Sequence, residues 1–261
     1  MKFVTKTYEI HSNKITNGKQ LSIILLSDLH LAEYGEDNIE LINEIRRVHP
    51  DLILSSGDLI TAMTDHDTLV AEKLLETLAK DYPVYYAAGN HEERLKVRTE
   101  WFGNRYQTFL KKMKQYGVQF LHNESQTINV KGLSICIHGL ALPLNYFKRM
   151  ARIKLEVQTI DTLLGKAEED KFNILLAHHP RFGTAYFSWG ADLILSGHVH
   201  GGVMRIGSIA CISPDMRIFP KYGYGKFNKD NRTMIVSSGL GEHTIPFRIF
   251  NPKELTHIVI K

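Results

Sequence analysis

Short apolar runs alternate with helix-like periodicity through the first two thirds of the chain. Five runs are continuous rather than alternating, and they are Leu21–Leu26, Leu52–Leu54, Pro83–Ala88, Phe172–Ala177 and Ala191–Leu195. Continuous runs of this length are typical of central strands that are covered on both faces. We therefore expect these five segments to be the inner strands of an α/β fold.

Three segments between the runs have helical spacing. Apolar residues recur every three positions over Ile39–Val48, and a second apolar stripe extends from Val70 to Leu78. Asp67 is placed to cap the second helix at its N-terminus. A third helix is expected over Trp101–Tyr116, because a glycine follows directly and favours a helix end.

The closing third of the chain has a different character. Met204–Ile212, Met234–Ser237 and Leu255–Ile260 are predicted to be strands, and Gly, Pro and Asn turns join them. A second sheet packed on the first is the natural inference, with an antiparallel flank. No repeat, low-complexity tract or linker divides the sequence, so we expect a single domain over residues 1–261.

Composition and charge narrow the class of protein. Hydrophobic residues make up 43% of the 261 positions, and the net charge of +4 comes from scattered Lys and Arg. A nucleic-acid partner is not expected from such a pattern. Cys136 and Cys211 lie inside apolar runs and are expected to be buried free thiols.

The length of the apolar runs and the first residues of the chain bear on localisation. No run approaches the ~20 apolar residues of a membrane span, and no export signal begins the chain. As written, the chain is expected to be cytoplasmic. The alternative is a membrane-associated or exported protein whose N-terminal anchor was trimmed.

Residue types that bind metals follow each of the five apolar runs. In chain order the clusters are Ser27-Asp28-Leu29-His30, Gly57-Asp58, Gly89-Asn90-His91-Glu92, His178-His179-Pro180 and Gly197-His198-Val199-His200. Ligands of α/β sheets bind at the carboxyl ends of strands, where such loops can converge. Each cluster alone is weak evidence, but their joint occurrence in order predicts a metal site.

The number of candidate ligands favours two ions. The candidates are Asp28, His30, Asp58, Asn90, His178, His198 and His200. Seven ligands are too many for one ion that keeps an open position, whereas two ions sharing a carboxylate fit. Asp58 is the expected bridge, because each of its two oxygens can take one ion.

The charge of this site favours a phosphate substrate. Two divalent ions, two carboxylates and a bridging hydroxide leave about one positive charge to attract a phosphoryl group. Oxygen and imidazole ligands without thiolate suit Mn, Fe, Zn or Co. We expect a phosphohydrolase that cleaves a mono- or diester by attack of the metal-bridging hydroxide, with diesters slightly favoured.

These motifs resemble those of the calcineurin-like metallophosphoesterase superfamily. The matching patterns are D-L-H, G-D, G-N-H-E, H-x-P and G-H-x-H, and the later stretches Tyr222–Gly225, Ser237–Gly241 and Ile245–Arg248 are similar to its YkuE-like bacterial branch. The resemblance implies a four-layer α-β-β-α sandwich. The stretch Gly57–Thr61 departs from the G-D-x-x-D-R-G form of protein phosphatases, which puts phosphoprotein activity in doubt.

The resemblance also implies how the ligands are divided between two divalent ions. It assigns Asp28, His30, Asp58 and His200 to one ion, and Asp58, Asn90, His178 and His198 to the other. His91 is expected to be the general acid that protonates the leaving group, since its ordinary pKa of about 6.5 suits that role. The alternative for His91 is to orient Asn90, and Glu92 is expected to support a ligand from behind.

Several further residues are left with open roles. His179 is either a solvent-facing filler or a substrate contact, and His138 is expected to be structural. His243 and Arg248 lie in segments that could reach the cleft and hold a phosphate. Leu140–Arg152 and Pro214–Asn231 are expected to carry specificity, with the second as a substrate lip. Trp101 and Phe102 are expected to be either a helix start or rim residues.

Two classes of function remain in view. The first is an enzyme acting on a small or lipid-like phosphate ester, and the second is a metal-binding scaffold of the same fold without turnover. The complete set of expected ligands favours the enzyme. The sequence lacks H-E-x-x-H and G-x-S-x-G, which excludes a zinc peptidase or serine hydrolase of the usual kind. Oligomeric state is left open.

Overall fold

The first of two six-stranded sheets contains both ends of the chain. The computed structural model describes residues 2–15, 18–149, 152–242 and 248–261. The strand order of the first sheet is β1 (Val4–Ile10), β14 (Glu254–Ile260), β2 (Leu21–Leu26), β3 (Leu52–Ser55), β4 (Val84–Ala87) and β5 (Gln119–Leu121). Within it β2, β3 and β4 are parallel neighbours, so their carboxyl ends lie at one edge.

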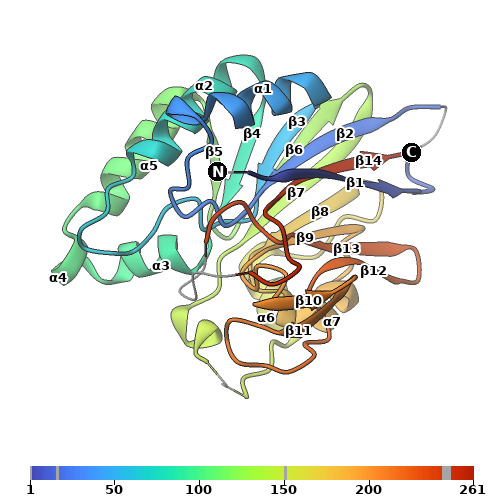
Figure 1. Ribbon diagram of the computed structural model, residues 1–261. Helices are drawn as coiled ribbons and strands as arrows, with labels where there is room; N and C mark the ends of the chain where they lie inside the picture. The colour runs from blue at the N-terminus through green and yellow to red at the C-terminus, as the bar shows by residue number, and fades with distance from the viewer. Residues whose placement is uncertain (1, 16–17, 150–151, 243–247) are drawn as a thin grey trace.

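The second sheet packs against the first (Figure 1). Its order is β12 (Gly225–Lys229), β13 (Arg232–Val236), β9 (Leu193–Ser196), β8 (Phe172–Ala177), β7 (Leu133–Leu140) and β6 (Glu124–Val130). Here β8 and β9 are parallel neighbours. A short hairpin of β10 (Met204–Ile206) and β11 (Ile209–Ile212) lies outside both sheets.

Alternating faces of the strands build three layers of core. In β2, Ile23 and Leu25 point between the sheets, where they meet residues such as Ile174 of β8. Ile24 and Leu26 point the other way, toward the helices on the outside of the first sheet. This is the pattern expected of strands buried on both faces.

Helices cover the outer face of each sheet. The helices over the first sheet are α1 (Ile39–Val48), α2 (Leu69–Asp81) and α5 (Arg105–Tyr116), and those over the second are α6 (Val157–Leu164) and α7 (Gly183–Trp189). Two shorter helices, α3 (Asn90–Val97) and α4 (Thr99–Phe102), follow β4, and single 3-10 turns occur at Glu36–Asn38, Leu144–Phe147 and Pro180–Phe182. The expected four-layer α-β-β-α sandwich is confirmed.

All five apolar runs form strands, but they divide between the sheets. The first three supply β2, β3 and β4, and the last two supply β8 and β9. Leu255–Ile260 also forms a strand, yet it returns to the first sheet as β14, antiparallel to β2. The closing third therefore completes both sheets rather than one.

Three local expectations were wrong. The helix expected over Trp101–Tyr116 is broken at Gly103, whose φ of 58° lies in the left-handed region, so α4 and α5 are separate. Thr68, not Asp67, occupies the N-cap of α2, although the Asp67 carboxylate accepts a hydrogen bond from the Leu69 N–H at 3.0 Å. The expected Pro214–Asn231 loop contains strand β12.

Two further findings concern the cysteines and the character of the helices. Cys136 and Cys211 are buried and unbonded to each other, as expected. Across the described ranges, no helix combines the length and the apolar character that crossing a membrane requires.

Candidate metal centre

The loops that follow the five apolar strands meet at the carboxyl ends of these strands. Backbone hydrogen bonds tie them to one another: the Asp28 N–H donates to the Gly57 carbonyl at 3.1 Å, and the Gly197 N–H donates to the His178 carbonyl at 3.0 Å. Three groups of side chains come close enough to hold an ion, and they are Asp28, His30 and His200; His30, Asp58 and His91; and Asp58, His178 and His198. The structure thus brings together the residues that the sequence singled out.

The first group has the spacing of a shared ion. Nε2 of His30 and Nε2 of His200 are 3.2 Å apart, and these atoms lie 3.8 and 3.4 Å from Oδ1 of Asp28. Two donors that bind one ion at about 2.1 Å and a tetrahedral angle lie about 3.4 Å apart. The three atoms therefore fit one divalent ion.

The third group is centred on His178. Its Nε2 lies 3.0 Å from Oδ2 of Asp58 and 3.8 Å from Oδ1 of Asp28. Its Nδ1 is 3.0 Å from the Ser56 carbonyl, an acceptor that places the ring proton on Nδ1. A carbonyl behind a histidine in this way leaves Nε2 with a lone pair directed at the site, which is the arrangement of a metal ligand.

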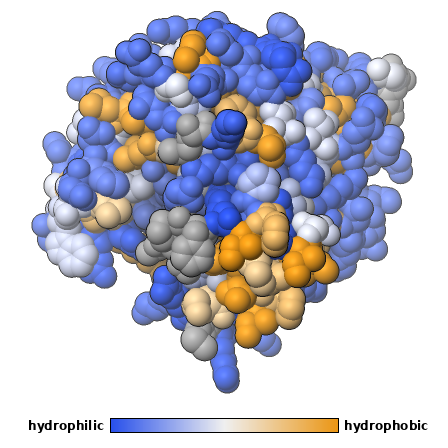
Figure 2. Space-filling model, in the orientation of Figure 1, coloured by the Kyte–Doolittle hydropathy of each residue, from blue (hydrophilic) through white to orange (hydrophobic). Residues whose placement is uncertain are grey.

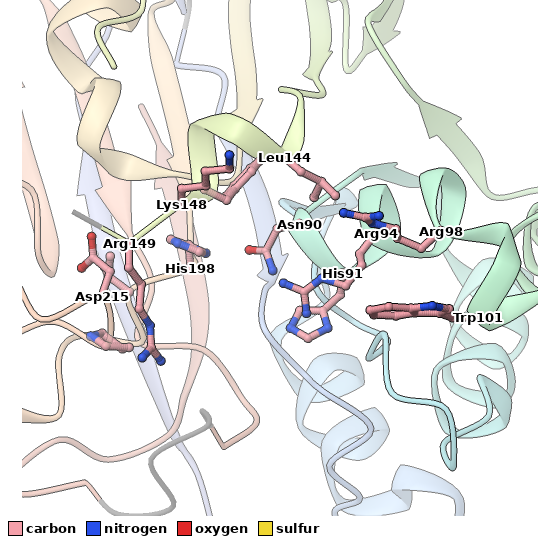
Figure 3. A pocket seen from close by; sticks show the side chains of 13 residues that line it. Asn90, His91, Arg94, Arg98, Trp101, Leu144, Lys148, Arg149, His198 and Asp215 are labelled. Atoms are coloured by element: carbon pink, nitrogen blue, oxygen red, sulfur yellow. The ribbon is translucent and has the colours of Figure 1, made fainter. Parts of the chain in front are cut away.

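Asn90 adds an oxygen with no other partner. Its Oδ1 is buried and accepts no hydrogen bond from the described residues, and it points toward His198 in the close view of the pocket (Figure 3). A buried polar atom without a partner is costly unless a ligand satisfies it. Asn90 therefore fits the role of an ion ligand.

Five of the seven candidate ligands have an unusual backbone conformation. Asp28, His30, Asp58, His198 and His200 all have φ between 46° and 68°. Non-glycine residues rarely adopt this left-handed region, and strain of order 1–3 kcal/mol each persists where the surroundings enforce it. Clustered strain of this kind is typical of functional sites, and it explains how tight strand-end turns aim these side chains inward.

Two glycines allow the loops to approach one another closely. A Cβ on Gly89 would lie 2.2 Å from Oδ1 of Asp58, and one on Gly197 would lie 2.1 Å from Oδ2 of Asp28. Only glycine fits at such distances. The glycines of the G-N-H-E and G-H-x-H motifs are thus needed for space around the carboxylates.

The charges of the buried groups depend on one another. Burial raises the pKa of Asp28 to about 6, against the lowering effect of His178. Burial acts the same way on Asp58, but the imidazoles of His178 and His91 outweigh it and hold the pKa of Asp58 well below its usual range. For His178 the carboxylates outweigh burial and raise its pKa to about 9. Without an ion, a proton on His178 thus balances Asp58, and an ion would replace that proton.

His91 faces the centre from α3. Its Nδ1 accepts a hydrogen bond from the Ala62 N–H at 2.8 Å, so the ring hydrogen is on Nε2, which lies 4.0 Å from Oδ2 of Asp58. Burial lowers the pKa of His91, and the Asp58 charge offsets part of this. The Nε2–H is therefore available as a hydrogen-bond donor beside Asn90.

Glu92 lies behind the ligands, as expected. It is fully buried, and its Oε2 accepts hydrogen bonds from the N–H groups of Asp58 at 3.0 Å and Gly89 at 2.8 Å. Its other oxygen accepts from the Tyr86 hydroxyl. Burial and the Asp58 charge raise the pKa of Glu92 to about 7. One carboxylate thus joins the loops after β3 and β4.

Arg248 does not face the cleft. Its guanidinium donates to the Ser238 carbonyl at 2.7 Å and lies 3.1 Å from Nδ1 of His200, with its side chain 9% exposed. Binding of an ion to Nε2 of His200 requires the proton on Nδ1, so this contact must then be released. His243, the other residue considered for phosphate, lies outside the described residues.

His179 and His138 are both buried. The expectation that His179 faces solvent was wrong, because this residue is 2% exposed and its ring centre lies 4.2 Å from that of His198. Burial and His198 hold the pKa of His179 well below its ordinary value. His138 is held by Ser125 and Asn173 at 2.7 and 3.1 Å, which confirms its structural role.

A groove of about 470 Å³ opens from Asn90, His91 and His198. Its walls carry four cations, which are Arg94, Arg98, Lys148 and Arg149, together with Trp101, Leu144, Phe147, Val199, Pro214 and Asp215. Figure 3 shows Arg94, Arg98 and Trp101 on one wall and Lys148 and Arg149 on the other. Trp101 is on the rim as expected, whereas Phe102 is buried.

Phe147 was not singled out by the sequence. Its ring lies 5.3 Å from the ring of His198 and 5.6 Å from that of His179. The only signal was its place inside Leu140–Arg152, the segment expected to carry specificity. Phe147 thus covers the rings of His179 and His198.

The donor atoms fit two divalent ions. They are carboxylate and amide oxygens and imidazole nitrogens, which suit Mn, Fe, Zn and Co. Three features agree with such ions. They are the Asn90 oxygen, which has no partner in the described part of the chain, the His178 tautomer with Nε2 facing the site, and the 3.2–3.8 Å spacing of the first group.

Comparison with known proteins assigns this fold and site to a class. The calcineurin-like phosphoesterase family matches residues 21–202. The metallophosphoesterase-named protein F40B5.2 of Caenorhabditis elegans is 30% identical over 254 residues, which cover 94% of this chain and 49% of that protein. The Bacillus subtilis proteins YpbG and YkuE are 27% and 25% identical, over 97% and 98% of this chain and 86% and 85% of their own lengths.

The fold is also found in solved structures. That of the phosphopantetheinyl hydrolase of Mycobacterium tuberculosis has a TM-score of 0.52 at 14% identity and covers 84% of this chain and 89% of the other. The chain spans about half the length of the C. elegans relative and most of the two bacterial ones. The chain belongs to the calcineurin-like phosphoesterase family, whose members are dinuclear, metal-dependent phosphoesterases.

Proposed function

We propose that this protein hydrolyses a phosphate ester with two divalent metal ions held by seven side chains. Asp28, His30, Asp58 and His200 would hold one ion, and Asp58, Asn90, His178 and His198 the other. The observation that carries the proposal is the convergence of two ligand groups on either side of Asp58.

Asp58 is the shared ligand in this proposal. Its Oδ1 accepts a hydrogen bond from the His91 N–H at 2.8 Å, whereas Oδ2 faces His178 at 3.0 Å and His91 Nε2 at 4.0 Å. Oδ2 is thus the oxygen that faces the imidazoles, and Asp58 would be the residue that holds both ions, as the sequence led us to expect.

The chain positions a phosphoryl group between these ligands and the cationic groove. When bound, the two ions supply positive charge to the phosphoryl oxygens and the acidity that generates a nucleophile from water. Lys148 and Arg94 lie on opposite walls beside the site and attract an anionic substrate. Phe147 and Val199 limit access of water along the same groove.

His91 is proposed to act on the leaving group. Its Nε2–H faces the centre, and because Nδ1 accepts from the Ala62 N–H, the neutral ring would stabilise a departing oxygen by donating this hydrogen bond, instead of by the full proton transfer that the sequence led us to expect. Residues in such a role contribute typically 10²–10⁴-fold, about 3–5 kcal/mol of the barrier. The alternative, orienting Asn90, predicts the same loss for every leaving group.

The choice of ester and metal is also a proposal. Mn, Fe or Zn suit the ligand set, and a groove that continues past His91 toward Arg98 and Trp101 leaves room for the second substituent of a diester. A small or lipid-like diester is therefore favoured slightly over a monoester. The competing candidate is a metal-binding scaffold without turnover.

The test compares bis-(p-nitrophenyl) phosphate with p-nitrophenyl phosphate. Chelated protein is re-supplied with Mn, Zn, Fe or Co, and bound metal is counted by elemental analysis. Metal-dependent turnover is expected, with the diester hydrolysed faster. Two bound ions without turnover of either ester would favour the scaffold.

A further inference from the structure

A large exposed apolar surface lies beside the groove. Among the described residues thirteen large apolar side chains are exposed, and seven of them belong to residues 206–250. These seven are Ile206, Ile209, Met216, Ile218, Phe219, Ile249 and Phe250, with exposed fractions from 42% to 80%. Figure 2 shows hydrophobic side chains gathered over β10 and β11. We call these seven residues the hairpin patch.

The patch is one face of a small sheet. In the β10–β11 hairpin Ile206 pairs with Ile209, and β-bridges add Ile249 beside Met204 and Ile218 beside Ile212. Arg205 and Ala210, which also pair, are buried on the inner face. Aliphatic side chains thus face outward on this hairpin, where a sheet face exposed to water usually has polar residues.

An apolar face of this kind is rare on a monomer in water. Single exposed hydrophobic residues are common, whereas contiguous patches usually mark contact with a protein or a membrane. The outward side chains are Ile, Phe and Met, without the Tyr, Trp and Arg that supply hydrogen bonds in the centre of protein interfaces. The composition therefore favours a partner that offers only apolar contact.

Basic residues surround the loop that carries part of the patch. Two cavities flank Arg217–Lys221, and their lining includes Arg152, Lys154, Arg181, Arg217 and Lys221 against the acids Glu156 and Asp215. Asp215 is already paired with Arg217 at 2.7 Å. Lys148 and Arg149 follow on the adjoining groove wall. An apolar face next to a positive rim complements an anionic lipid surface.

We propose that the hairpin patch docks this protein onto the surface of an anionic lipid bilayer. The seven apolar side chains enter the interface, and the basic residues around them contact the headgroups. Two copies joined through the patch would instead bring two positive rims together, which like-charge repulsion disfavours.

Docking in this orientation brings the catalytic groove to the membrane. Pro214 and Asp215 line the groove and directly precede Met216 of the patch. A phosphate ester in a lipid headgroup would thus reach the groove without leaving the bilayer. This consequence rests on the proposed function, whereas docking itself does not.

The test is sedimentation of the full chain with vesicles. Phosphatidylcholine vesicles are compared with vesicles that contain about 30% phosphatidylglycerol, a fraction that gives a clearly negative surface. Binding is expected with the anionic vesicles and is expected to weaken as salt is raised. The double variant Ile209→Glu, Ile218→Glu is expected to bind at least about tenfold more weakly, because two charges replace buried apolar area.

A matched control variant shows whether a loss of vesicle binding is specific to the hairpin patch. Ile39→Glu changes an isoleucine of similar exposure, 47%, at the first position of α1 on the opposite side of the molecule (Figure 1), and should bind like the unchanged protein. Both variants should hydrolyse a soluble nitrophenyl ester at the unchanged rate. Binding without hydrolysis would refute the proposed function and leave docking intact.

Three outcomes would overturn docking to an anionic bilayer. They are absence of binding to the anionic vesicles, equal binding to neutral vesicles at all salt concentrations, and a dimer by light scattering that the double variant dissociates. The last outcome would assign the patch to a second copy of this chain.

Discussion

The two sheets hold their parts of the candidate centre in different ways. The first sheet contributes the oxygens together with the imidazole of His30, and hydrogen bonds to the backbone fix the carboxylates: Asp28 accepts from the His198 N–H at 3.0 Å, and Asp58 accepts from the His91 N–H at 2.8 Å. The second sheet contributes imidazoles, and rings pack around them, with His178, His179 and Phe147 all near His198. We call these the oxygen side and the imidazole side.

The difference has a physical cause. A carboxylate has several lone pairs, so it can accept hydrogen bonds from the backbone and still bind an ion. An imidazole has one nitrogen for the ion and one for a single hydrogen bond, so its orientation depends on packing. Damage to the oxygen side should therefore cost more metal than comparable damage to the imidazole side.

The largest effect is expected from Asp58→Asn. The change keeps the shape of the side chain but removes the negative charge that two of the three ligand groups share. Loss of several kcal/mol of charge stabilisation corresponds to a rate reduction of about 10³-fold or more. Elemental analysis measures the loss of bound metal, and turnover of a nitrophenyl ester measures the loss of activity.

An exposed carboxylate in the loop after β3 gives the control for Asp58→Asn. Asp65→Asn removes an equal charge from a solvent-facing loop and should leave metal content and rate unchanged. Two tightly bound ions and full activity in Asp58→Asn would rule out a shared carboxylate.

The next effect separates two roles of His91. His91→Ala is expected to slow esters with alkyl leaving groups by about 10²-fold or more and nitrophenyl esters by less than about 10-fold, since a nitrophenolate leaves without a proton. Rates on both esters are compared with those of His11→Ala, which changes an exposed histidine far from α3 in sequence. Equal losses on both esters would indicate that His91 only orients Asn90 or the phosphoryl group.

The ligands of the oxygen side could be predicted from the sequence better than the residues and the backbone conformation that hold them in place. Strand-end positions of Asp28, Asp58 and Asn90 follow from five apolar runs, because inner strands must be hydrophobic throughout. Glu92 was recognised only as a supporting residue, since a motif does not reveal that its carboxylate would bridge two loops. The left-handed backbone at Asp28 and Asp58 has no sequence signal at all.

Edge strands and packing explain what the sequence did not reveal. β1 and β6 have mostly exposed or half-exposed positions, so neither contains a buried apolar run that could mark it as a strand. The imidazole side depends on Phe147, which lies 51 positions before His198 along the chain, and only the fold brings them together. His179 was misjudged for the same reason, because adjacent histidines in a sequence carry no information on burial.

The smallest effects compare the support of the two sides directly. Glu92→Ala removes the acceptor of the Asp58 and Gly89 N–H groups, and it should weaken metal binding by about 10–100-fold. Glu92→Gln keeps an acceptor oxygen and should recover part of that affinity, which a merely destabilised fold would not predict.

On the imidazole side, His179→Phe preserves a ring against His198 and should change metal affinity by less than about threefold. Metal titration measures all three variants, with circular dichroism as a check on folding. If His179→Phe costs as much metal affinity as Glu92→Ala, ring packing fixes the centre as firmly as backbone hydrogen bonds, and the contrast between the two sides fails.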